Sequence, residues 1–178
     1  MGVVMKQLWF SLVFAALLNA PALGATITQN DRTAILTAID TTNAAFARRD
    51  PEAVADLTFD KLMDAIGGRA KYIEALKSSF KTIDAEVVKI VSHKADVRND
   101  VTFADGYYIC VVNEVTDMNL RGQNVRNIAF TLAIRKGPEG PWKLIGGNGI
   151  SQNPRILTFL FAGLPADFKI PETSMKPF

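Results

Sequence analysis

Residues 127–134, NIAFTLAI, decide the fold class, because large apolar side chains alternate with small or polar ones along them. This period of two is typical of a β-strand with one buried face. The face predicted to be buried carries Ile128, Phe130, Leu132 and Ile134. The second half of the chain is therefore predicted to contain a β-sheet.

Further strand candidates lie on both sides of this segment. Residues 86–93 and 107–115 are rich in β-branched and aromatic side chains, and residues 142–147 follow a turn at 137–140. A symmetric turn at 119–122 would make 107–115 an antiparallel neighbour of 127–134. The sequence thus predicts an antiparallel sheet of about four to six strands.

This pairing predicts which side chains share a face. The inner face would combine the large side chains of 128–134 with those of Tyr107, Ile109 and Val111, and Asn113 would be its odd polar residue. The outer face would hold Tyr108, Cys110, Val112 and Glu114, which is more apolar than contact with water requires. We expect this outer face to form a homodimer interface. A shift of one residue in the pairing would exchange the two faces.

Helical patterns precede the strands. A first helix is predicted from a cap at Asn30 or Asp31 to about Phe46, with apolar residues at helical spacing. Asp50 and Pro51 predict the start of a second helix, which would run on to 67–68, a pair of glycines. A third helix would follow from Arg69. Three helices followed by an antiparallel sheet predict an α+β roll.

The first residues indicate export. Residues 1–24 combine Lys6, an apolar run at 8–18 and small residues before a cleavage site after Ala22 or Gly24, with Met1 or Met5 as the start. The apolar run is shorter than the ~20 residues that a membrane span needs. The expected product is a periplasmic or secreted protein, without a lipid anchor or a transmembrane span.

The composition limits the remaining possibilities. The whole chain has 178 residues and a net charge of +2, which gives no sign of nucleic-acid binding. Cys110 is the only cysteine, so an intrachain disulfide is excluded. We expect residues 25–153 to form one domain, and 154–178 to add a short helix and a proline-containing tail that dock on it.

Several local patterns resemble one known family. Residues 49–54, RDPEAV, residues 67–73, GGRAKYI, and a strand at 128–135 that leads into 141–144, PWKL, are similar to the nuclear transport factor 2-like superfamily, especially its secreted bacterial members of unknown function. The resemblance spans roughly 31–171. It implies a cone-shaped fold around a pocket. The superfamily includes isomerases, lyases and non-catalytic binding modules, so the resemblance implies no single activity and assigns no catalytic residue.

Five residues are candidates for ligand contact. Asn113 needs a hydrogen-bond partner on an apolar wall, and the Tyr107 and Tyr72 hydroxyls can donate to a ligand carbonyl. His93 and Asp60 can set the orientation of a ligand or transfer a proton. Each also has an ordinary structural role open to it, in packing or on the surface. No metal site is predicted, because there is no second histidine and no thiol cluster. No cofactor is predicted either.

Three functions remain open at this point. In the first, the pocket binds a small apolar molecule. In the second, the protein's own side chains fill the cone and its outer sheet face forms a homodimer or binds a protein partner. In the third, a proton-transfer isomerase or lyase has a carboxylate or His93 within reach of Tyr107 or Asn113. The first is favoured.

Overall fold

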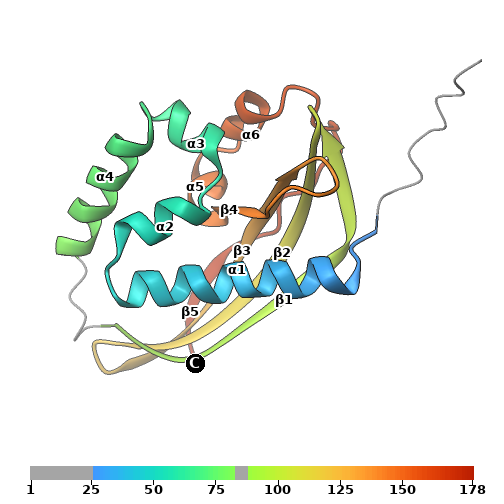
Figure 1. The fold of residues 1–178 in the computed structure, drawn as a ribbon. Coiled ribbons are helices and arrows are strands. Elements are labelled where there is room, and N and C mark those ends of the chain that lie inside the picture. The colour runs from blue at the N-terminus through green and yellow to red at the C-terminus, as the bar shows by residue number, and fades with distance from the viewer. Residues whose placement is uncertain (1–25, 83–87) are drawn as a thin grey trace, which may run out of the picture.

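The computed structural model describes residues 26–82 and 88–178. The predicted leader at 1–24, with its cleavage site, lies outside them. The described residues form an α+β fold in which helices precede a curved antiparallel sheet, as predicted (Figure 1). The helices are α1 (Gln29–Ala47), α2 (Pro51–Leu57), α3 (Asp60–Ala65), α4 (Arg69–Thr82), α5 (Gly147–Gln152) and α6 (Arg155–Leu160). The strands are β1 (Val88–Ala104), β2 (Tyr107–Leu120), β3 (Gln123–Lys136), β4 (Lys143–Gly146) and β5 (Ser174–Pro177).

The sheet is open and antiparallel. Its strands follow the order β1-β2-β3-β4, and β5 pairs with the first part of β3. Five strands fall within the predicted range. In the described ranges, no helix has the length and apolar character needed to cross a membrane.

Two tight hairpins fix the register of the long strands. Asp105 and Gly106 join β1 to β2, and Arg121 and Gly122 join β2 to β3, all with positive φ. Two-residue turns of this kind match the twist of antiparallel strands. The predicted centre of the second turn was one residue too early, so each β2 residue pairs two positions further along β3 than expected. The predicted first strand was also too short, because the Asp-Gly turn extends β1 to Ala104.

The sheet separates two apolar cores. On one face, Ile109 and Val111 pack with Phe130, Leu132 and Ile134, as predicted, beneath α5, α6 and the tail. On the other face, Cys110 and Val112 pack under α1. Cys110 and Val112 are both 0 % exposed. The assignment of this second face to the outside is therefore wrong, because α1, and not a second subunit, covers Cys110 and Val112. The strand pattern grouped the side chains correctly but did not show which face the first helix covers.

Helix α1 begins with a capping box that reaches across the fold. Thr28, rather than Asn30 or Asp31, is the N-cap, and its hydroxyl accepts a hydrogen bond from the Asp31 amide. The Asp31 carboxylate accepts a hydrogen bond from Arg135 of β3 at 2.6 Å and one from the Trp142 indole at 3.4 Å. The Arg135 guanidinium also lies over the Trp142 ring. One carboxylate thus joins the start of α1 to the sheet.

The predicted second helix is divided. It starts as expected, with Asp50 as N-cap and Pro51 at the first helical position, but α2 ends before Thr58. Thr58 forms a bridge with Leu144 of β4, and the Phe59 amide donates to the Leu144 carbonyl. The chain then resumes as α3. Burial of the Phe59 side chain in the core beneath the sheet favours this break, because a continuous helix would not contact β4.

Close packing around Gly147 leaves no room for a side chain there. A Cβ at Gly147 would lie 2.4 Å from the Phe130 carbonyl oxygen, whereas a Cβ at Gly149, two residues further along α5, would meet nothing within 4 Å. We expect Gly147→Ala to lower the free energy of unfolding by about 1–3 kcal/mol through overpacking. Gly149→Ala is the matched control and should leave it unchanged or raise it. Chemical denaturation measures both, and an equal effect of the two substitutions would contradict the packing at Gly147.

Candidate functional site

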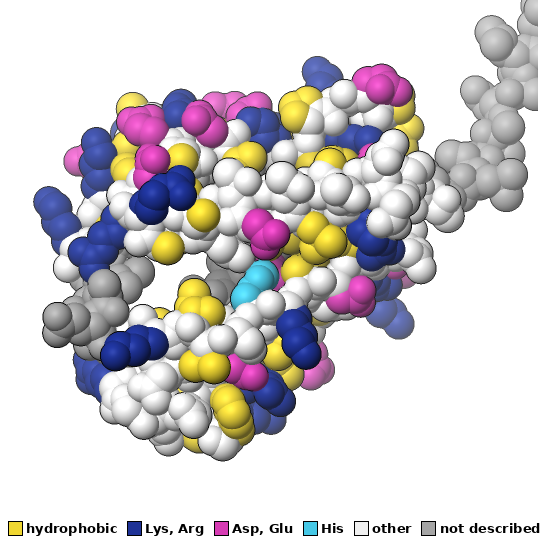
Figure 2. Space-filling view, turned by 60° about the horizontal axis from the view of Figure 1, so that its bottom comes forward, with side chains coloured by type: hydrophobic (Ala, Val, Ile, Leu, Met, Phe, Trp, Pro, Cys, Tyr) yellow, Lys and Arg dark blue, Asp and Glu magenta, His cyan; other side chains and the backbone are white. Residues whose placement is uncertain are grey.

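A cavity of about 360 Å³ lies between the helices and the sheet at β4, and residues of both apolar cores line it. In the space-filling view, the surface is hollowed between the helical layer and the sheet (Figure 2). Residues from α1 to α6 and from β2 to β4 contribute to the lining. Most of the lining is apolar, and it includes Ile39, Phe46, Val54, Leu144, Ile145 and Ile150.

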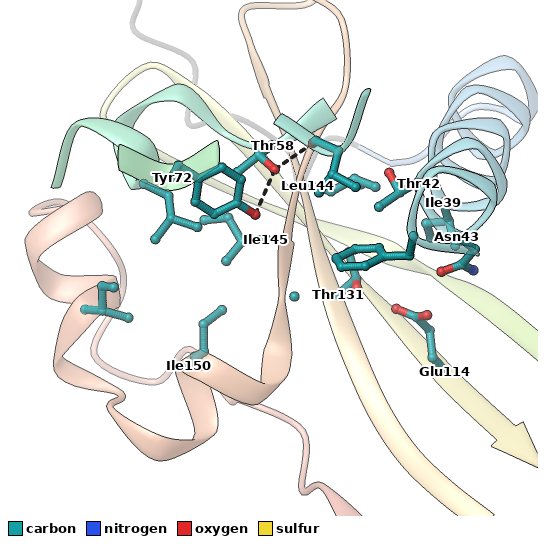
Figure 3. Close-up of a pocket in the computed structure, with 16 residues that line it drawn as sticks. Ile39, Thr42, Asn43, Thr58, Tyr72, Glu114, Thr131, Leu144, Ile145 and Ile150 are labelled. Atoms are coloured by element: carbon teal, nitrogen blue, oxygen red, sulfur yellow. Dashed lines mark hydrogen bonds between the residues drawn. The ribbon is translucent and has the colours of Figure 1, made fainter. Parts of the chain in front are cut away.

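Polar side chains lie at two separate places in this lining (Figure 3). Thr58 and Tyr72 lie on one side, where their hydroxyl oxygens are 3.2 Å apart. The Thr58 hydroxyl donates to the Val54 carbonyl, so the Tyr72 hydroxyl is left to donate to Thr58 or to a ligand. Asn43 and Glu114 lie on the other side, with aliphatic side chains between the two polar groups.

The break between α2 and α3 positions the first polar group. Thr58 leaves the helical path because of its bridge to Leu144, and this turns its hydroxyl towards α4. Tyr72 reaches the same point from the first turns of α4, which begins after Gly67 and Gly68, both with positive φ. The two residues thus depend on backbone features that the glycine pair and the bridge impose.

The second polar group extends through a hydrogen bond to His93 on β1. Glu114 points from β2 to the cavity, and its Oε2 lies 2.9 Å from the Nε2 atom of His93 on β1. The Glu114 side chain is 15 % exposed and that of His93 is 21 % exposed. In the part of the chain that the structure describes, His93 is the hydrogen-bond partner of this carboxylate. His93 therefore holds Glu114 in place without itself lining the cavity.

The five sequence candidates are dispersed. Tyr72 lines the cavity, and His93 contacts it through Glu114. Tyr107 packs on the opposite face of the sheet against Phe59. Asn113 and Asp60 are exposed and do not line the cavity. Tyr107 and Asn113 belong to the other face, and among the described residues no hydrogen bond joins either side chain to a carboxylate or to His93.

Sequence reasoning missed Glu114 and Thr58. Glu114 interrupts an apolar alternation on β2 in the same way as Asn113, but it belongs to the face that was assigned to the outside. A correct choice of the helix-covered face would have selected it. Thr58 gave no signal, because its role depends on a bridge to Leu144, a residue far away in the sequence.

Cys110 does not take part in the site. Burial, with a smaller effect of the Asp100 charge, raises the pKa of the Cys110 thiol to about 12. The thiol is therefore protonated at neutral pH, which fits the packing role expected from its mid-strand position. Within 26–82 and 88–178, no three potential metal ligands cluster together.

The cavity can hold an apolar molecule and form hydrogen bonds with it at both ends. An apolar body fits between the aliphatic side chains, the Tyr72 hydroxyl can donate a hydrogen bond at one end, and the Glu114 carboxylate can accept one at the other. Comparison with known proteins adds no name to this site: no protein-family model matches the chain, and no curated protein is significantly similar to it.

Proposed function

We propose that the protein binds a small, largely apolar molecule in the cavity between its helices and its sheet. The observation that carries this proposal is the lining: a volume of about 360 Å³ enclosed mainly by aliphatic and aromatic side chains, with a few polar groups at its ends. Ligand sites typically have about 300–1,000 Å³ and this kind of lining. The cavity belongs to the smaller sites in this range.

We also propose where the protein is located and which kind of fold it has. The amino-terminal pattern supports export to the periplasm or beyond, and the helix and turn motifs support a cone-shaped roll of the nuclear transport factor 2-like kind. An open, curved antiparallel sheet that follows a helical layer agrees with such a roll. Binding in the hollow of the roll is the role we infer for this chain.

A variant that fills the cavity tests the proposal. Gly149 lines the cavity and has open space beyond its Cβ position, so Gly149→Leu should project a side chain into the cavity without a backbone clash. We expect this change to weaken the binding of hexanol, a neutral apolar probe, by about tenfold or more. Titration calorimetry on the full mature chain measures the affinity.

A surface variant provides the control. Ala70→Leu adds similar bulk to α4, where Ala70 is exposed and does not line the cavity. It should bind hexanol with the affinity of the unmodified protein. The proposal fails if the unmodified protein binds no hexanol, or if Gly149→Leu binds it as tightly as Ala70→Leu does.

A further inference from the structure

We propose that the ligand of this cavity is an amine, with a cationic nitrogen that Glu114 binds and an apolar body that lies between the helices and β4. This inference rests on the proposed function and names the class of ligand. It follows from the charge of the lining, the environment of Glu114 and the position of Asn43.

The formal charge in the lining is negative. Glu114 is the one carboxylate among the described residues that line the cavity, and no lysine or arginine is among them. A carboxylate ligand would therefore meet a like charge and no cation, whereas an ammonium group would meet an opposite charge. In a partly dehydrated cavity this difference is larger than it would be in water.

Within the described residues, the Glu114 carboxylate has only one of its two oxygens in a hydrogen bond. Its side chain is 15 % exposed, and His93 occupies one of its oxygens, Oε2. A carboxylate accepts hydrogen bonds at both oxygens, and its removal from water has a cost unless these bonds are made. The Oε1 atom is thus available for a donor on the ligand.

Asn43 completes the recognition site. Its side chain lines the same side of the cavity as that of Glu114 (Figure 3). An ammonium group has three N–H donors and no acceptor, so a carboxylate oxygen and an amide oxygen together are suitable partners. His93 then acts as a positioning residue, because it holds the carboxylate that contacts the ligand.

Three probes that share a six-carbon alkyl chain and differ in their head groups test the inference. Hexylamine, hexanol and hexanoate are cationic, neutral and anionic at neutral pH. We expect hexylamine to bind about tenfold more tightly than hexanol, which is the effect of one charge-assisted hydrogen bond, and hexanoate to bind most weakly. Titration calorimetry at low ionic strength on the mature protein gives the three affinities.

Glu114→Gln removes the charge and keeps the shape. It should abolish the preference for hexylamine over hexanol. Glu139→Gln is the matched control, because Glu139 is exposed in the turn after β3 and does not line the cavity. This control makes the same change in net charge and should keep the preference. Thermal unfolding of each variant establishes that it is folded.

The outcomes separate this inference from the proposed function. If hexanol binds as tightly as hexylamine, or if hexanoate binds most tightly, the assignment of an amine is wrong while the cavity remains a binding site. The same conclusion follows if Glu139→Gln abolishes the preference as fully as Glu114→Gln does. If none of the three probes binds, the proposed function itself fails. The comparison of probes on the unmodified protein holds even if Glu114→Gln does not fold.

Discussion

Replacement of Asp31 by asparagine is expected to lower the free energy of unfolding by about 3 kcal/mol at neutral pH. The substitution keeps the shape of the side chain but leaves the Arg135 guanidinium without its anion, and the Nε atom of Arg135 is already buried without a hydrogen-bond partner in the described structure. Breaking a buried ion pair costs about 3–5 kcal/mol. We expect the lower end, because the Asp31 and Arg135 side chains are still 11 % and 17 % exposed.

The control is Asp100→Asn. Asp100 pairs with Arg98 on the surface of β1, where both side chains are well exposed. Exposed pairs of this kind contribute less than about 1 kcal/mol. Urea denaturation measures the free energy of unfolding of the two variants. Equal losses would contradict a larger stabilisation by the contact between Asp31 and the sheet.

The effect of Asp31 should also depend on pH. Burial acts to raise the pKa of Asp31, but the hydrogen bonds from Thr28, the charge of Arg135 and the Trp142 indole together hold it below its ordinary value of 3.8. The unfolded chain therefore takes up this proton at a higher pH than the folded chain. The stabilisation is complete above the unfolded pKa and is lost as the pH falls through the folded pKa. The difference between the unmodified protein and Asp31→Asn should accordingly be constant above about pH 5 and shrink in stronger acid.

Leu132→Ala is the second substitution with a large expected effect. Leu132 is 0 % exposed at the centre of β3 and packs in the core beneath α5 and α6. Removal of a buried leucine side chain costs about 2–5 kcal/mol, through lost burial and the cavity that remains. Urea denaturation should show this loss with an unchanged slope.

Ile128→Ala on the same strand and the same face is the control. Ile128 is 43 % exposed, so its truncation should cost about 1 kcal/mol or less. A cost at Ile128 as large as that at Leu132 would contradict the described packing of β3.

Local signals predicted the elements of this fold well. The alternation in 127–134, the Asp50-Pro51 helix start and the glycine pair at 67–68 each act over a few residues, and each gave the expected strand, cap or boundary. A proline-containing tail was also expected, but its pairing with β3 was not, because a four-residue strand has no distinctive pattern of its own.

The candidate site was predicted less well than the fold. Both faces of β2 are apolar, so the alternation does not show which face α1 covers. The wrong choice excluded Glu114 and selected Asn113 and Tyr107. Tyr72 was found because its hydroxyl could be considered without knowledge of the sheet. Contacts such as Thr58 with Leu144 arise only when distant segments meet.

The most direct test of the account is to locate a bound probe by nuclear magnetic resonance of isoleucine methyl groups. During a titration with hexanol, the methyl signals of Ile39, Ile145 and Ile150, which line the cavity, should shift and saturate together. The signal of Ile90, which is 65 % exposed on β1, should not change. Shifts confined to Ile90, or cavity signals that remain unchanged at saturating probe, would contradict binding between the helices and the sheet.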